Sequence, residues 1–133
     1  MQKFDPKVYE LIEECRQSKS KRLDLGNLGL TKIPEEVFEL TWLEELNFGE
    51  DFYFDEEKKA FVKTKNEGEK NQIEAIPTWI GLFKNLSVLS FDSNQIRKIE
   101  NLSKSSNLKY LELSSNQITK IENLENLTQL SKL

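Results

Sequence analysis

The amino-acid sequence predicts an α/β solenoid, in which short repeats stack side by side and share one parallel sheet. Three observations predict this fold class. Groups of aliphatic residues recur at a nearly constant spacing, each group alternates apolar and polar residues, and an amphipathic segment precedes the first group. Because a single repeat cannot bury its own apolar face, neighbouring repeats must stack to form a continuous core.

The repeat is clearest in two segments. Residues 89–96 (LSFDSNQI) align with residues 111–118 (LELSSNQI), which lie 22 positions later. Leu23 and Leu46 start groups of the same phase, 23 positions apart, and Leu89 follows Leu46 by 43 positions. We therefore count four repeats and a stub at the end of the chain, and one repeat carries an insertion of about 20 residues.

Each repeat is expected to contribute one short strand. In the first group Leu23 and Leu25 alternate with polar neighbours, so the two leucines point into the core and the residues between them face water. Pro34 and Pro77 lack a backbone N–H, which favours irregular or short helical segments on the opposite, convex side.

An asparagine follows three of the four strands at the point where the backbone turns inward. Asn94 and Asn116 occupy this position, Asn71 occupies it once the insertion is removed, and Leu28 replaces it in the first repeat. A side-chain amide both donates and accepts, so these asparagines are expected to satisfy backbone groups inside the coil.

The pattern L-x-x-L-x-L-x-x-N-x-L resembles the leucine-rich repeat and extends from about Arg22 to the end of the chain. The resemblance implies a horseshoe-shaped solenoid with a concave parallel sheet that binds partners. The segments 33–37 and 76–80, each containing Ile-Pro, resemble repeats of intracellular signalling scaffolds. The segments 99–102 and 121–124 resemble the shorter repeats of protein-phosphatase regulatory subunits.

The first residues predict a helix that caps the solenoid. Asp5 and Pro6 suit the start of a helix, and Val8, Ile12 and Cys15 then lie on one apolar face together with Leu11. We divide the chain into a capping helix, 1–19, and repeats, 20–133. The first forty residues also resemble the opening of repeat domains in bacterial Roco-type GTPases.

The insertion spans about residues 51–70. Phe52, Tyr53 and Phe54 precede a charged turn, and Phe61 follows it within a second short apolar run. This pattern predicts two strands of a hairpin that projects from the side on which the strands end. The alternative is a mobile charged loop, but clustered aromatic side chains are costly to leave in water. These four aromatic residues are candidate partner contacts.

Composition argues against several functions. The net charge is -4, with 19 basic and 23 acidic residues, so we expect no binding to nucleic acid. The sequence has no histidine and one cysteine, Cys15, which leaves no metal cluster, no cofactor site and no nucleophile with a base. We expect a cytoplasmic protein that is no enzyme, because the chain has neither a secretory signal nor a membrane span.

The residues that face water on the concave sheet are the candidate partner site. Acidic groups outnumber basic groups among them, which favours a protein or peptide partner of basic character. The candidate contacts are Glu45, Asn47, Val88, Ser90, Asp92, Tyr110, Glu112 and Ser114.

The sequence therefore predicts a protein-interaction module for signalling or scaffolding inside the cell. The alternative is an N-terminal sensor segment of a larger Roco-type GTPase or another multidomain signalling protein. The chain stops on Leu133, the first strand leucine of a fifth repeat. This uncapped end predicts either a continuation of the repeat array or self-association.

Overall fold

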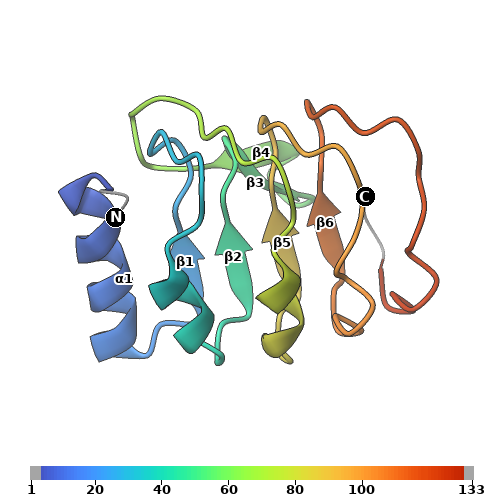
Figure 1. Ribbon diagram of the computed structural model, residues 1–133, viewed down its shortest axis with the longest axis horizontal. Coiled ribbons are helices and arrows are strands. Elements are labelled where there is room, and N and C mark those ends of the chain that lie inside the picture. The colour runs from blue at the N-terminus through green and yellow to red at the C-terminus, as the bar shows by residue number, and fades with distance from the viewer. Residues whose placement is uncertain (1–3, 131–133) are drawn as a thin grey trace.

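The computed structural model describes residues 4–130, and its elements follow one another as repeating coils (Figure 1). The elements, in chain order, are α1 (Pro6–Ser18), β1 (Arg22–Asp24), the 3-10 helix η1 (Glu35–Glu39), β2 (Glu45–Asn47), β3 (Asp51–Asp55), β4 (Ala60–Lys63), the 3-10 helix η2 (Thr78–Leu82), β5 (Val88–Ser90) and β6 (Tyr110–Glu112).

Four strands form one parallel sheet in the order β1-β2-β5-β6. Leu23 pairs with Leu46, Leu46 with Leu89, and Leu89 with Leu111, so the register is the one that the repeat spacing predicts. The 43-residue gap between β2 and β5 leaves the register of the sheet unchanged because the extra residues leave the coil between two strands.

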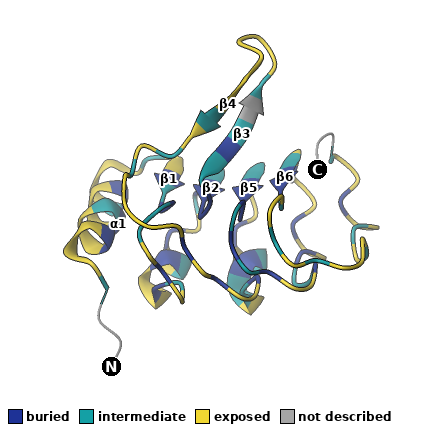
Figure 2. Cartoon of the chain, turned by 90° about the horizontal axis from the view of Figure 1, so that it is seen from above, coloured by how far each residue is buried: buried dark blue, intermediate teal, exposed yellow. Residues whose placement is uncertain are grey.

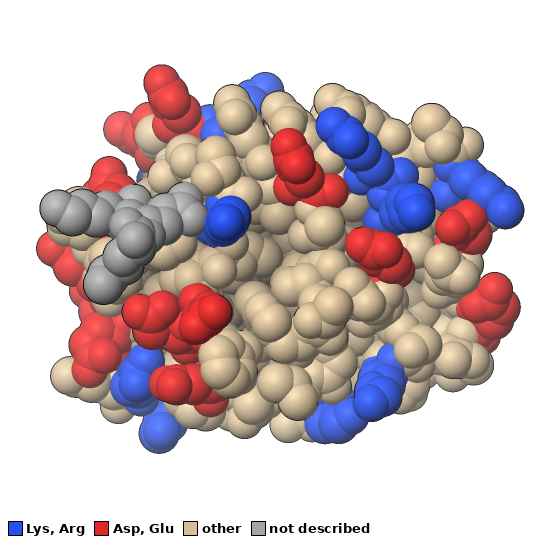
Figure 3. All heavy atoms as spheres, viewed as in Figure 1, with Lys and Arg blue, Asp and Glu red and all other residues tan. Residues whose placement is uncertain are grey.

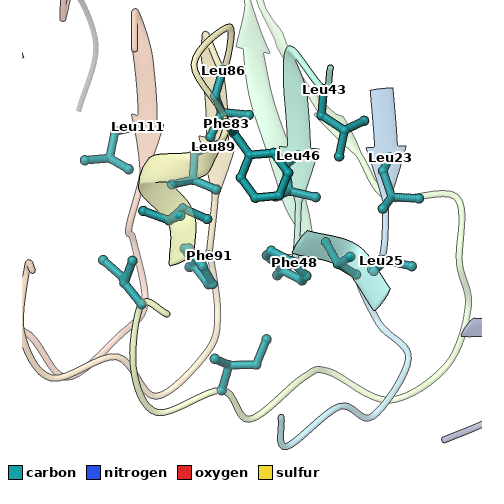
Figure 4. Packing of buried hydrophobic residues seen from close by; sticks show 14 of the residues in the cluster. Leu23, Leu25, Leu43, Leu46, Phe48, Phe83, Leu86, Leu89, Phe91 and Leu111 are labelled. Atoms are coloured by element: carbon teal, nitrogen blue, oxygen red, sulfur yellow. The ribbon is translucent and has the colours of Figure 1, made fainter. Parts of the chain in front are cut away.

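The core lies between this sheet and the chain segments that return on its other side (Figure 4). The strand residues Leu46, Leu89 and Leu111 have no exposed surface. Two residues after Leu46 and Leu89, the rings of Phe48 and Phe91 stack with their centroids 5.1 Å apart. Each coil thus buries its aliphatic and aromatic side chains against the next coil.

The return segments contain the short helices that the prolines predict. η1 begins directly after Pro34 and η2 directly after Pro77. Each buries one aliphatic residue, Val37 and Ile80 respectively. On this side of the molecule the surface has an uncharged centre, and most charged side chains lie around it (Figure 3).

α1 lies beside β1 at the first edge of the sheet (Figure 1). The side chain of Asp5 accepts a hydrogen bond from the backbone N–H of Lys7, and Pro6 is the first helical residue. Val8, Ile12 and Cys15 are buried in the same core as the strand leucines. The buried face of α1 therefore packs against the first coil.

β3 and β4 form the predicted antiparallel hairpin, which stands out from the face of the sheet opposite η1 and η2 (Figure 2). Asp55 pairs with Ala60, and the register shifts between Asp51 and Tyr53. We call the sheet face that carries the hairpin, predicted above to be concave, the hairpin face.

Candidate binding surface

Two rows of side chains on the hairpin face cross the four strands at right angles. Strand pairing places the members of each row opposite one another, in adjacent strands that run roughly 4.8 Å apart. The first row is Arg22, Glu45, Val88 and Tyr110, and the second row is Asp24, Asn47, Ser90 and Glu112.

The start of the hairpin is bonded through the backbone of Asp51 to Ser90 of the second row and to Asp92, two residues further along the chain. The N–H of Asp51 donates to Oδ2 of Asp92 at 2.9 Å, and its C=O accepts from the hydroxyl of Ser90 at 2.6 Å. The carboxylate of Asp51 also forms an ion pair with Lys63 on β4, with 3.6 Å between the charged atoms. The first residue of the hairpin is therefore held by both the sheet and the second hairpin strand.

The end of the hairpin is tied to Asp24 on β1. The hydroxyl of Thr64 donates to the Asp24 carboxylate at 2.8 Å, and the side-chain amide of Asn47 donates to the same group at 2.9 Å. Asn66 donates to the backbone C=O of Asp24 and of Gly26. The contacts of Thr64 and Asn66 join residues about forty positions apart and fold the insertion back onto the sheet.

Close approach of the backbones requires glycine at the entrance to the hairpin. A Cβ atom on Gly49 would lie 2.5 Å from the backbone nitrogen of Asp92, and one on Gly26 would lie 2.1 Å from the backbone oxygen of Gly49. Both distances are too short for a side chain. Glycine at these two positions therefore allows neighbouring coils to meet below the hairpin.

The hairpin buries part of the surface that the sequence predicts to face water. Asn47 and Ser90 have no exposed surface, and Asp92 and Glu112 are 4% and 6% exposed. The expectation of water-facing side chains is therefore wrong at these four positions. At Ser90 and Asp92 the backbone of Asp51, the first residue of the insertion, supplies hydrogen bonds that water would otherwise supply. Asn47 and Glu112 are satisfied by residues outside the insertion: Asn47 by Asp24 and Gly49, and Glu112 by Ser114.

Burial changes the electrostatics of Asp92. Loss of solvent raises the pKa of its carboxyl group, and the carboxylates of Asp51 and Glu112 raise this pKa further. The hydrogen bonds from the backbone N–H of Asp51 and the hydroxyl of Ser93 act in the opposite direction. Glu112 accepts from the backbone N–H and the hydroxyl of Ser114. The buried carboxylates are thus held by local donors.

A cluster of aromatic and charged side chains remains accessible above the first row. Arg22 donates to the hydroxyl of Tyr53 at 3.2 Å and forms an ion pair with Glu45 at 2.6 Å. The rings of Tyr53 and Tyr110 meet edge to face, with centroids 6.4 Å apart. The side chains of Arg22 and Glu45 are 47% and 31% exposed. Residues from three strands of the sheet and from the hairpin therefore form one surface.

The aromatic residues of the insertion have different environments. Phe52 is 2% exposed, and the guanidinium of Arg22 lies 5.0 Å from its ring centre. Tyr53 is half-buried, whereas Phe61 is 47% exposed on β4. Phe54 lies in β3, paired with Phe61. Burial thus separates Phe52, which packs on the sheet, from Tyr53 and Phe61, which a partner can reach.

The asparagine ladder is confirmed. The side-chain amide of Asn71 donates to the backbone oxygens of Leu25 and Phe48 and accepts from the backbone N–H of Leu30. Asn94 and Asn116 make corresponding bonds one and two coils further along. Asn71 also accepts from the N–H of Leu28, so the residue that replaces asparagine in the first repeat is held by the second.

The sequence analysis did not predict a second asparagine ladder. Asn101 donates to the backbone oxygen of Ile76, and Asn123 donates to that of Ile99, both at 2.8 Å. Both asparagines have positive φ angles, 64° and 61°. The sequence carries a signal for this ladder, because Asn101 and Asn123 each lie seven positions after an asparagine of the first ladder.

No group of three or more Cys, Asp or Glu side chains in residues 4–130 is arranged to hold a metal ion. The described helices include none of the length and apolarity that crossing a bilayer requires. Burial raises the pKa of the Cys15 thiol, whose sulfur lies 3.4 Å from the backbone oxygen of Ser20. A raised pKa disfavours the nucleophilic thiolate.

The overall fold matches solved structures. A leucine-rich repeat protein of Leptospira interrogans superposes on the whole chain with a TM-score of 0.59 at 24% identity. The fold is a leucine-rich repeat solenoid. An internalin (inlF) of Listeria monocytogenes matches 96% of the chain with a TM-score of 0.59 at 22% identity. No family model and no curated protein matches the sequence. The chain spans 35% of the Leptospira protein and 42% of the internalin.

Proposed function

We propose that the chain is a protein-interaction module that binds a partner protein or peptide on its hairpin face. The observation that carries this proposal is the cluster of Arg22, Tyr53 and Tyr110, which joins the sheet and the hairpin into one prearranged surface. Tyrosine and arginine are enriched among residues that dominate binding energy. Their mutual contacts hold them in place before binding, so less side-chain freedom is lost when a partner docks.

The predicted contacts divide into two groups by burial. One group is accessible and is proposed to touch the partner: Glu45, Tyr53, Phe61, Val88, Tyr110 and Ser114. Phe54 stays a predicted contact. The other group is buried and is proposed to position the hairpin: Asn47, Phe52, Ser90, Asp92 and Glu112.

The partner's proposed chemistry also changes with burial. Preference for a basic partner rested on carboxylates that face water, but Asp92 and Glu112 are covered. Glu45 is paired with Arg22, so the accessible cluster presents aromatic surface and balanced charge. We therefore propose a partner surface with an apolar or aromatic centre and few charges, because an unpaired charge there would lose its water without gaining a counter-ion.

The biological setting is proposed from the repeat pattern. The Ile-Pro repeats resemble those of intracellular signalling scaffolds, which supports a role in signalling or scaffolding in the cytoplasm. The second candidate is a sensor segment at the N-terminus of a larger signalling protein, supported by the resemblance of the first forty residues to Roco-type repeat domains. Reading the gene beyond codon 133 tests this candidate, because it requires an open frame that encodes a GTPase domain.

The interaction is tested by comparing variants on the two faces of the molecule. The immobilised chain is exposed to lysate of the source cell, and a retained protein is purified and its dissociation rate measured. We expect Tyr110→Ala and Tyr53→Ala to dissociate about 30-fold faster, which corresponds to about 2 kcal/mol for a central aromatic contact. Leu82→Ala is the matched control, because Leu82 is 47% exposed but lies in η2 on the opposite side. Loss of binding in Leu82→Ala alone would contradict the proposal.

A further inference from the structure

The side of the molecule that carries η1 and η2, opposite the hairpin face, has an accessible apolar centre. The rings of Phe38 in η1 and Trp79 in η2 lie 6.2 Å apart between centroids, and both are half-buried. Leu82 is 47% exposed and follows Trp79 by three residues, which places both on the same side of a 3-10 helix. We call this surface, formed by Phe38, Trp79 and Leu82, the helical face.

The exposed part of the helical face is additional to the core of the solenoid. The residues by which η1 and η2 enter the core are Val37 and Ile80, and both have no exposed surface. Clustered apolar side chains on a surface favour association, because a partner that covers them removes them from water. The helical face is therefore a candidate interaction surface.

Charges of opposite sign lie on the two sides of the apolar centre. η1 carries three exposed carboxylates, those of Glu35, Glu36 and Glu39, and acidic side chains gather over it in Figure 3. On the far side of η2, a Cβ atom on Gly81 would lie 3.2 Å from Cβ of Lys104, so this lysine lies directly beside η2. Within the described residues neither Glu36 nor Lys104 is part of an ion pair.

The order of these groups, acidic, apolar and then basic, is complementary to itself. A two-fold axis through the apolar centre turns a second copy by 180°. Lys104 of each copy then faces η1 of the other copy, and the apolar side chains of both copies meet at the axis. A partner of another kind would need the same three groups in the same order, and the chain itself presents them.

We propose that two copies of the chain form a symmetric dimer through the helical face, with Glu36 of each copy beside Lys104 of the other. The apolar side chains form the centre of the interface, and the two pairs of opposite charges fix its orientation. The surface lies on internal coils, so it is distinct from the end of the repeats, where the sequence predicts a continuation or self-association.

The dimer is independent of the partner binding proposed above. The hairpin of each copy points away from the helical face, so both hairpin faces stay open in the dimer (Figure 2). Leu82→Ala, the control for partner binding, therefore changes the helical face and leaves the partner contacts untouched.

Sedimentation equilibrium of the full chain tests whether the dimer forms. We expect a reversible equilibrium between monomer and dimer with a dissociation constant on the order of 100 µM, because the apolar centre is small. Added salt should weaken the dimer, since the charge pairs at its two ends are screened. A chain that stays monomeric at about ten times that concentration overturns the proposal, in favour of a partner other than a second copy.

Two charge reversals test how the copies face each other. Glu36→Lys and Lys104→Glu should each weaken self-association about tenfold, because each places like charges at both ends of the symmetric interface. An equal mixture of the two variants should form a dimer as stable as that of the parent, since every introduced charge then faces one of opposite sign. Recovery in the mixture also shows that neither variant is misfolded.

Glu57→Lys and Lys58→Glu are the matched controls. They make the same changes of charge at exposed residues in the turn between β3 and β4, on the opposite side of the molecule. Both should self-associate like the parent. Equal weakening by these controls, or no recovery in the mixture of Glu36→Lys with Lys104→Glu, overturns the proposal. Species larger than a dimer overturn the two-fold arrangement, because a symmetric interface closes with two copies.

Discussion

The surroundings of Asn94 and Asn116, two members of the same ladder, have the same hydrogen-bond chemistry but different degrees of burial. Asn94 is 6% exposed, and the coil that follows it covers the backbone it binds. Asn116 makes corresponding bonds to the preceding coil. It is only half-buried, because few of the described residues lie on its other side. This difference indicates that the repeat sequence specifies each coil, whereas burial by the neighbouring coil determines how much each polar group contributes to the free energy of unfolding.

The largest expected change in stability is the loss caused by Asn94→Ala, compared with that caused by Asn116→Ala. Asn94→Ala should lower the free energy of unfolding by about 3 kcal/mol, because several backbone groups lose their partner in a buried site. Asn116→Ala should cost about 1 kcal/mol, because water can reach part of the site it leaves. Equilibrium unfolding in urea measures both values.

Asn126→Ala is the matched control for that comparison. Asn126 is exposed, and its side chain is 3.4 Å from the backbone oxygen of Ser103, a long hydrogen bond. Its replacement should change stability by less than about 0.5 kcal/mol. Equal losses for Asn94→Ala and Asn116→Ala would mean that burial by a following coil does not set the strength of the ladder.

A smaller effect is expected on the docking of the hairpin, and it differs between two phenylalanines of the insertion. Phe52→Ala should weaken the docking of the hairpin by about 2 kcal/mol, because it exposes the base of the hairpin and removes a buried ring. Phe61→Ala, at a ring that is 47% exposed, should change docking by less than about 0.5 kcal/mol. Hydrogen exchange at the amides of Asp51 and Lys65 reports docking, since they donate to the carboxylates of Asp92 and Asp24, which the open hairpin would release.

Unchanged exchange at those two amides in Phe52→Ala would show that the polar contacts alone hold the hairpin. In that case Ser90→Ala becomes the informative variant, because it removes the donor to the backbone of Asp51.

The sequence predicted the sheet, its register and the hairpin, because each produces a local pattern. Leu23, Leu46, Leu89 and Leu111 recur at a spacing that only stacked coils explain, and they pair as expected. The burial of Asp92 was not predictable in this way. Its cover comes from Asp51, forty-one positions away, through one backbone N–H, and backbone groups carry no signal in a sequence. The sequence therefore assigned the wrong exposure to Asp92, and the assignment of partner contacts to this face stays a prediction.

The smallest expected effect is a pH dependence of hairpin docking that arises from Asp92. Burial under the hairpin raises the pKa of this carboxyl group, so the docked state binds a proton more tightly than the open state does. Docking should therefore strengthen as the pH falls from neutral through the raised pKa. The gain should be complete below the ordinary value near 3.8.

Asp92→Asn isolates this contribution, because an amide oxygen can still accept from the N–H of Asp51 but carries no charge at any pH. The hairpin is also held by the carboxylate of Asp24 and by the ion pair between Asp51 and Lys63, and both stay in the variant. Subtracting the variant's exchange profile from that of the parent removes their response to acid. We expect the difference to show stronger protection of the Lys65 amide, which donates to Asp24, in the parent as pH falls. A difference of the opposite sign would mean that the ionised carboxylate of Asp92 stabilises the docked hairpin through its hydrogen bond to Asp51 more than its burial disfavours it.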